Sequence, residues 1–164
     1  MRLDLRDIIA IPGGEVPFDY QADVSECAEL PIKEFTGPAD VKGSIRNSAG
    51  VLKFSAELDA EAVFVCDRCL REDVRHIHRH IDATLADNAQ DSEDPDMFPL
   101  DGNLADVDEI VLTALILSAE ETHLCREDCK GLCHRCGADL NCGPCSCKKE
   151  IDPRLAVLGQ LLEK

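Results

Sequence analysis

Apolar and polar residues alternate through much of the first half of the chain. The alternation is clear in residues 16–24, 41–46 and 51–58, and a further short apolar run follows at 62–65. A period of two is typical of a β-strand with one face in a core and the other in solvent. The turn-forming residues 47–50 separate two of these runs and indicate a hairpin. The pattern therefore predicts an antiparallel sheet over roughly residues 1–70.

The segment at residues 71–86 fits either a helix or a strand. Its apolar residues recur at a helical spacing, at Val74, Ile77, Ile81 and Leu85. Because the segment directly follows a Cys-x-x-Cys knuckle, it can also return beside the preceding strand, and we favour the strand. Three histidines then share one strand face, His76, His78 and His80. That arrangement suits a metal or a phosphate, although an exposed polar face is the simpler explanation.

An acidic stretch separates the predicted sheet from a helical region. Residues 82–108 contain nine acidic residues and no Lys or Arg. From residue 105 to about 121 we expect a helix with acids in its first turn and an apolar face that covers the sheet. Asp152 and Pro153 begin a short C-terminal helix.

The predicted fold class is α+β, in three parts. Residues 1–86 form an antiparallel β domain that ends in the Cys-x-x-Cys knuckle. Residues 87–104 form an acidic linker or loop. Residues 105–164 hold the covering helix, a cysteine-rich zinc module and the short C-terminal helix.

Seven of the ten cysteines lie between Cys125 and Cys147, in a segment with almost no large apolar residues. Such a segment cannot fold by burial alone and needs disulfides or a metal ion. The Cys-x-x-Cys-Gly spacing favours the tetrahedral thiolate sites of zinc. The first predicted zinc site consists of Cys133, Cys136, Cys145 and Cys147.

The remaining cysteines allow a second zinc site. Its predicted ligands are Cys66, Cys69, Cys125 and Cys129. The alternative is a single site that takes Cys129 with Cys133 and Cys136 and leaves Cys66 and Cys69 as free thiols. The sequence therefore predicts one or two zinc ions, with Cys27 and Cys142 outside both sites.

The net charge of −16 argues against general binding of nucleic acid. Residues 1–124 have 10 Lys and Arg against 27 Asp and Glu, a net charge of −17. Any contact with nucleic acid must therefore be local. The one basic strip in this part of the chain is our candidate for it, and it consists of Arg68, Arg71, Arg75 and Arg79.

The N-terminal residues, the apolar runs and the cysteines together indicate the cellular compartment. The first residues carry acids where a secretory signal would be basic and apolar, and the longest apolar run is too short for a membrane span. We therefore expect a cytoplasmic protein with no membrane partner. Thiols stay reduced in the cytoplasm, which favours metal binding over disulfides.

The spacing of these motifs resembles the YceD family, described as the large ribosomal RNA subunit accumulation protein. The resemblance rests on Cys66-Asp-Arg-Cys69-Leu70, the cysteine cluster up to Cys145-x-Cys147, and Asp152-Pro-Arg-Leu. Cys142 departs from the family pattern, which typically has another residue there. Family members are linked to accumulation of large-subunit ribosomal RNA, with no agreed reaction.

The resemblance implies a non-enzymatic zinc-binding factor in ribosome assembly, whose partner is a precursor ribosomal RNA or a ribosomal protein. The acidic composition favours the protein. A thiol redox or zinc-switch protein that uses Cys66 and Cys69 is the alternative. A zinc enzyme is not expected, because the sequence has no His-x-Glu or His-Glu-x-x-His motif and all-cysteine sites are typically closed.

Overall fold

A computed structural model describes residues 1–27, 32–86, 96–117 and 122–147. In chain order its elements are β1 Arg2–Asp4, α1 Arg6–Ile9, β2 Glu15–Ala22, the 3-10 turn η1 Ser25–Cys27, β3 Ile32–Phe35, β4 Ala39–Ser48, β5 Val51–Val65, β6 Glu72–Ala86, β7 Met97–Pro99, β8 Leu104–Asp106 and α2 Val107–Leu117. The predicted α+β class is confirmed. No helix in these ranges is long and apolar enough to cross a membrane.

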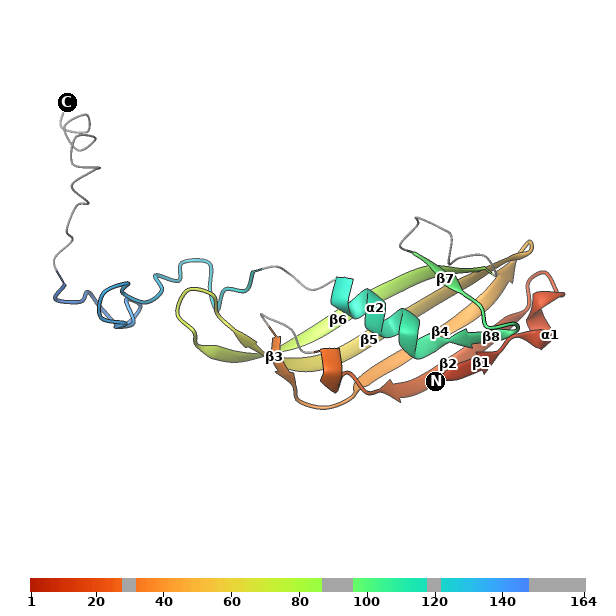
Figure 1. Ribbon diagram of the computed structural model, residues 1–164, viewed down its shortest axis with the longest axis horizontal. Coiled ribbons are helices and arrows are strands. Elements are labelled where there is room, and N and C mark those ends of the chain that lie inside the picture. The colour runs from red at the N-terminus through yellow and green to blue at the C-terminus, as the bar shows by residue number, and fades with distance from the viewer. Residues whose placement is uncertain (28–31, 87–95, 118–121, 148–164) are drawn as a thin grey trace, which may run out of the picture.

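Six strands form the main sheet. Its order is β2-β4-β5-β6-β7, and β3 pairs with the part of β5 that lies beyond β4. All pairs in it are antiparallel except β6 with β7. The strands β5 and β6 are the longest, at 15 residues each, and they pair along almost their whole length. This long hairpin forms the centre of the fold (Figure 1).

The sheet buries one face. On β5 every second residue from Leu52 to Ala62 is buried, while the residues between them point towards solvent. Helix α2 contributes Val107, Ile110 and Val111 to the same core, so it covers the sheet as predicted (Figure 1). The alternating pattern in the sequence therefore corresponds to a real division between a core face and an open face.

The hairpin between β4 and β5 is tighter than expected. Strand β4 continues to Ser48 and β5 begins at Val51, so only Ala49 and Gly50 form the turn. Both have positive φ, 53° and 93°, as in a two-residue type I′ turn. The run predicted as a third strand at 62–65 is the end of β5, because that strand is not interrupted after residue 58.

The strand preferred for residues 71–86 is confirmed as β6. Within the linker or loop predicted at 87–104, residues 97–99 form β7 on the edge of β6. Phe98 and Leu100 pack against the core and explain why this part is held. Residues 87–95, the end predicted for the covering helix at 118–121 and the C-terminal helix predicted after Asp152 lie outside the described residues.

The third predicted part, residues 105–164, has two described portions, helix α2 and the cysteine-rich segment. Its helix α2 packs on the sheet, and β8, directly before the helix, pairs with β1. Its cysteine-rich segment instead lies beyond the end of the sheet, beside the turn between β5 and β6 (Figure 1). The helix is separated from the cysteines because its apolar face belongs to the sheet core.

The side chain of Asn47 in β4 connects helix α1 to the sheet. This side chain is 1% exposed, and its Nδ2 donates to the carbonyl oxygens of Ile8 and Ile9 at 2.9 and 2.7 Å. Its Oδ1 accepts from the N–H of Gly50 at 2.8 Å. We expect Asn47→Ala to lower the free energy of unfolding by about 3 kcal/mol, since a buried side chain loses three hydrogen bonds to backbone groups.

Urea denaturation measures this effect. The exposed neighbour Ser48 supplies the matched control, and Ser48→Ala is expected to change stability by less than about 0.5 kcal/mol. Equal stability of the two variants would contradict the role given to Asn47.

Candidate metal centre

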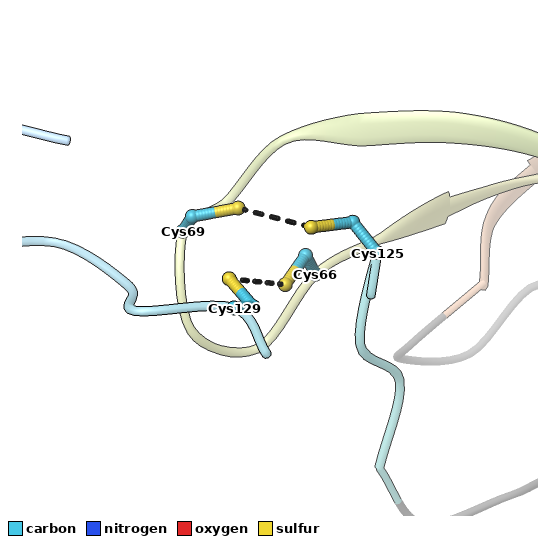
Figure 2. A group of neighbouring side chains, drawn as sticks. All are labelled: Cys66, Cys69, Cys125 and Cys129. Atoms are coloured by element: carbon cyan, nitrogen blue, oxygen red, sulfur yellow. Dashed lines mark hydrogen bonds between the residues drawn. The ribbon is translucent and has the colours of Figure 1, made fainter. Parts of the chain in front are cut away.

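The turn between β5 and β6 presents the first two cysteines. The N–H of Cys66 donates to the carbonyl of Arg71 at 2.9 Å, and the N–H of Leu70 donates to the carbonyl of Cys66 at 2.8 Å. Leu70 closes this knuckle with a φ of 57°, a conformation that costs a residue with a Cβ some strain. The turn places the sulfurs of Cys66 and Cys69 on its inner side (Figure 2).

Four sulfurs converge at this turn, and we call them the inner sulfur group: Cys66, Cys69, Cys125 and Cys129. All four Sγ atoms lie within 4.8 Å of one another. The Sγ atoms of Cys66 and Cys129 are 3.8 Å apart, and those of Cys69 and Cys125 are 3.6 Å apart (Figure 2). Segments distant in the sequence therefore meet here through sulfur.

A second set, the outer sulfur group, lies further along the chain: Cys133, Cys136, Cys145 and Cys147. Its Sγ atoms also lie within 4.8 Å of one another, and those of Cys145 and Cys133 are 3.4 Å apart. The N–H of Gly137 donates to the carbonyl of Cys133 at 2.8 Å, and the φ of 71° at Gly137 makes this second knuckle possible.

The sulfur spacing fits a tetrahedral metal ion. Zinc–thiolate bonds of about 2.3 Å give a regular tetrahedron with S···S edges of about 3.8 Å. The three distances above lie close to this value, and they are far longer than a disulfide bond of about 2.05 Å. No disulfide joins any of the ten cysteines, all of which lie in the described ranges. Both groups can therefore hold a metal ion.

The two sulfur groups can be compared with the two-site and single-site assignments of the cysteines that the sequence left open. The inner and outer groups contain the same residues as the two predicted four-cysteine sites. The single-site alternative placed Cys129 with Cys133 and Cys136, but the structure places Cys129 beside Cys66. Cys27 and Cys142 belong to neither group, and the sulfur of Cys142 lies 3.8 Å from a carboxylate oxygen of Asp139.

Backbone N–H groups stabilise at least one thiolate in each group. Burial opposes ionisation of Cys66, but N–H donation from nearby residues, Cys125 first, outweighs it and lowers the pKa to about 6. In the outer group the N–H groups of Cys136 and Arg135 lower the pKa of Cys133 to about 6. These donors favour the charged sulfur, which is the form that binds metal.

Other thiols in the same groups are held protonated when no metal is present. Burial and the neighbouring sulfurs raise the pKa of Cys125 to about 12. Contact with the sulfur of Cys136 and burial raise the pKa of Cys147 to about 12. A bound cation must therefore displace protons from these sulfurs.

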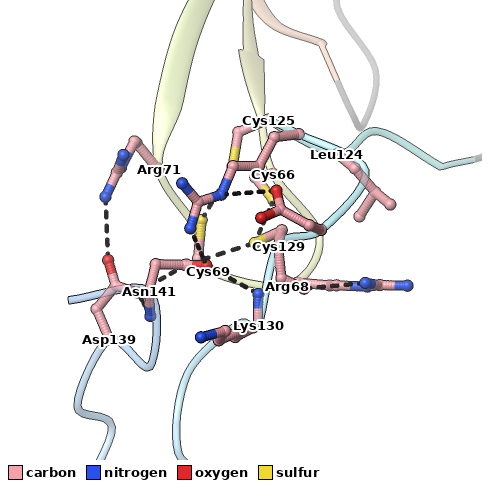
Figure 3. A network of polar contacts seen from close by, with 12 residues as sticks. Cys66, Arg68, Cys69, Arg71, Leu124, Cys125, Cys129, Lys130, Asp139 and Asn141 are labelled. Atoms are coloured by element: carbon pink, nitrogen blue, oxygen red, sulfur yellow. Dashed lines mark hydrogen bonds and ion pairs between the residues drawn. The ribbon is translucent and has the colours of Figure 1, made fainter. Parts of the chain in front are cut away.

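Three of the four arginines in the predicted basic strip contact the cysteine-rich segment. Because side chains alternate along a strand, Arg75 and Arg79 lie on the opposite face of β6 from the three histidines. Arg68 donates to the carbonyl of Cys129 at 2.9 Å, and Arg71 pairs with Asp139 at 3.1 Å (Figure 3). These arginines hold the cysteine-rich segment against the knuckle, and their contact with nucleic acid stays a prediction.

The other two arginines, Arg75 and Arg79, differ in what they contact. Arg75 donates to the carbonyls of Leu124 and Cys125 at 3.2 and 3.3 Å. Arg79 donates to the carbonyl of its neighbour His78 at 3.0 Å, which is a local contact away from the sulfurs. Arg79 is therefore the member of the strip that can be changed without removing a contact to the cysteine-rich segment.

His123 was missed by sequence reasoning. Its side chain is 5% exposed, its Nε2 lies 2.9 Å from a carboxylate oxygen of Asp73, and its ring lies 4.7 Å from that of Phe64. The N–H of His123 also donates to the carboxylate of Asp67 at 2.7 Å. These contacts fix the chain two residues before Cys125. A lone histidine before a cysteine cluster gives no sequence signal for such a role.

The three histidines of β6 share the open face of the sheet, as the strand interpretation implied. His78 and His80 lie against acids of β5, with Nδ1 of His78 2.8 Å from Asp59 and Nδ1 of His80 2.6 Å from Glu57. The Glu57 contact and the nearby Asp82 raise the pKa of His80. Carboxylates between the imidazoles make this face unsuitable for phosphate.

The fold and the two sulfur groups define a class of protein: an α+β chain whose long β-hairpin ends at a group of four sulfurs that can hold a metal ion. Residues 54–162 match the family model described as "Large ribosomal RNA subunit accumulation protein YceD". The match covers both sulfur groups and two thirds of the chain. The chain belongs to the YceD family.

Several curated proteins are similar to the chain. An uncharacterized protein of Mycobacterium leprae is 27% identical over 143 residues, which are 82% of this chain and 64% of that protein. One of Mycobacterium tuberculosis is 30% identical over 119 residues, 70% of this chain and 57% of the relative. The chain thus spans about three fifths of the length of these relatives.

A plant relative has a descriptive name. The "Large ribosomal RNA subunit accumulation protein YCED homolog 1, chloroplastic" of Arabidopsis thaliana is 35% identical over 75 residues. These residues are 45% of this chain and 23% of the plant protein. No solved structure matches the chain.

Metal content tests the two-site arrangement. We expect the purified, reduced chain to contain two zinc ions, one for each sulfur group. The double change Cys66→Ser with Cys69→Ser should lower the content to one ion, because it removes half of the inner ligands. Elemental analysis per chain gives the count. The matched control is Cys142→Ser, which should still bind two ions, and an unchanged count in the double variant would reject the inner site.

The pH dependence of metal binding follows from the thiol pKa values. Cys125 and Cys147 have their pKa raised to about 12, so each binding event at neutral pH releases at least one proton. Affinity at each site should therefore fall about ten-fold per pH unit for each proton displaced as the pH drops. Below about pH 6 the fall should steepen, because Cys66 and Cys133 also become protonated. Chelator competition at several pH values measures this slope, and a pH-independent affinity would contradict thiolate ligation.

Proposed function

We propose that this chain is a non-enzymatic zinc-binding factor that supports accumulation of large-subunit ribosomal RNA in the cytoplasm. It acts by binding a component of the precursor of the large ribosomal subunit. The observation that carries the proposal is the family match, which spans residues 54–162 and so includes all eight clustered sulfurs. The descriptive names of the family and of the plant relative supply the ribosomal context.

A structural role for the metal is supported by the ligand sets. Both groups offer four sulfurs, and a catalytic zinc needs an open position for water or substrate. Four thiolates close the coordination sphere and leave the ion no place to activate a substrate. The ion instead holds the cysteine-rich segment, which buries few apolar residues, against the end of the sheet.

A ribosomal protein is favoured over RNA as the direct partner. The chain carries a net charge of −16, and the open face of β5 exposes Glu57 and Glu61 beside the half-exposed Asp59. Three of the four candidate arginines already bind backbone carbonyls or a carboxylate at the cysteine region. An acidic surface of this kind suits basic segments of ribosomal proteins better than phosphates.

The alternative function is a thiol redox or zinc-switch protein at Cys66 and Cys69. The lowered pKa of Cys66 favours it, because a low pKa is typical of reactive thiols. Its burial speaks against it, since the Cys66 side chain is 0% exposed and lies inside a group of four sulfurs. Alkylation of the native, metal-loaded chain separates the two functions. A structural site protects Cys66 and Cys69, whereas a redox site leaves one of them reactive.

Co-sedimentation tests the proposed partner. We expect the metal-loaded chain to sediment with precursors of the large subunit at physiological salt, and to bind naked large-subunit RNA weakly under the same conditions, because its charge repels phosphate. For the variant Cys66→Ser with Cys69→Ser, most of the chain should no longer sediment with the precursors. Equal binding to naked RNA and to precursor particles would contradict the protein route.

A test of the basic strip as a binding surface requires a variant that leaves the proposed metal centre intact. Removing all four arginines would also release the cysteine-rich segment, so the loss of binding would have two explanations. Arg79→Gln avoids this problem, because Arg79 contacts only the carbonyl of its neighbour among the contacts described above. Full co-sedimentation of this variant would remove Arg79 from the contact.

A further inference from the structure

The two sulfur groups are joined by a short and well-fixed connection. Cys129 is the last inner ligand and Cys133 the first outer ligand, so only three residues separate the two groups. Within this connection the N–H of Leu132 donates to the carbonyl of Arg68 in the inner knuckle at 3.0 Å. A Cβ on Gly131 would lie 2.8 Å from the same carbonyl, so only glycine permits this close approach.

A loop of the outer group reaches back to the inner group. The loop lies between the outer ligands Cys136 and Cys145. Its Asn141 donates from Nδ2 to the sulfur of Cys129, an inner ligand, at 3.5 Å (Figure 3). The Oδ1 of Asn141 accepts from the N–H of Lys130 at 2.8 Å. One amide side chain thus bridges the outer loop and an inner sulfur.

A second contact runs beside the first. Asp139 of the same loop pairs with Arg71 of the inner knuckle at 3.1 Å, and its Oδ1 accepts from the N–H of Asn141 at 2.8 Å. The backbone of the loop is also held, since the N–H of Leu140 donates to the carbonyl of Gly131 at 2.9 Å. These contacts hold Asn141 in the position from which it donates to Cys129.

We propose that the two sulfur groups bind metal cooperatively, and that Asn141 is the positioning residue that couples them. The inference rests on the proposed metal binding. A metal at the outer group fixes both ends of the loop and so orders Asn141 before the inner group binds. The amide then donates to the Cys129 sulfur, and this donation is strongest when that sulfur is a metal-bound thiolate.

Reciprocity makes the coupling testable from either side. A metal in the inner group must favour binding at the outer group by the same factor, because both effects are one coupling free energy. In metalloproteins generally, loss of a hydrogen bond that a neighbouring residue makes to a metal ligand commonly changes metal affinity by about 10–100-fold. We therefore expect a coupling of about ten-fold in affinity.

Chelator competition on the zinc-loaded full chain measures the coupling. The release step that disappears in Cys66→Ser with Cys69→Ser identifies the inner site. Its affinity is then measured in four forms: the unchanged chain, Asn141→Ala, Cys145→Ser with Cys147→Ser, and all three changes together. Each of the two separate modifications should weaken inner zinc binding about ten-fold, and their combination should weaken it no further.

Two further variants make the experiment specific. Asn141→Asp keeps an oxygen for the Lys130 N–H but loses the donor to Cys129, so it should weaken inner binding at least as much as Asn141→Ala. The matched control Asn103→Ala changes an exposed asparagine in the turn before β8 and should leave both release steps unchanged. Wild-type affinity in Asn141→Asp would overturn the donor role.

The results separate this inference from the function on which it rests. Two zinc ions with independent affinities, or effects of the two modifications that multiply, would overturn the coupling and leave the proposed metal binding intact. A chain that binds no zinc would overturn both. Cooperative release that is lost in Asn141→Ala supports the coupling.

Discussion

The convergence of four sulfurs at the turn between β5 and β6 is the constraint on which this structure depends. It joins Cys66 to Cys129 across 63 positions of the sequence. Among the described residues, few apolar side chains surround these sulfurs, and those that pack against them are the partly buried Leu124 and Leu132. Hydrophobic burial therefore cannot hold the cysteine-rich segment in place, whereas a cation shared by four thiolates can.

The sheet provides a rigid platform for this centre. Strands β5 and β6 continue past the part of the sheet that α2 covers, and their turn carries the first two ligands (Figure 1). Arg68, Arg71 and Arg75 then bind the returning chain through carbonyls and the carboxylate of Asp139. Side chains that suggested nucleic-acid binding in the sequence thus have a structural task at the junction.

The sequence predicted what depends on local periodicity and ligand spacing. Alternation in residues 51–58 and the Cys-x-x-Cys pairs led to the sheet, the knuckles and the two ligand sets. It could not predict contacts between distant segments. The place of β7 on the sheet edge, the burial of His123 beside Phe64 and the reach of Asn141 to Cys129 all arise from tertiary packing, which leaves no local pattern.

X-ray absorption at the zinc edge of the reduced, purified chain tests the central claim most directly, because it reports the atoms bound to the metal and their distances. The account predicts four sulfur neighbours per zinc at about 2.3 Å, with two ions per chain. A first shell that contains nitrogen or oxygen, or a metal-free protein with sulfur–sulfur bonds of about 2.05 Å, would contradict it.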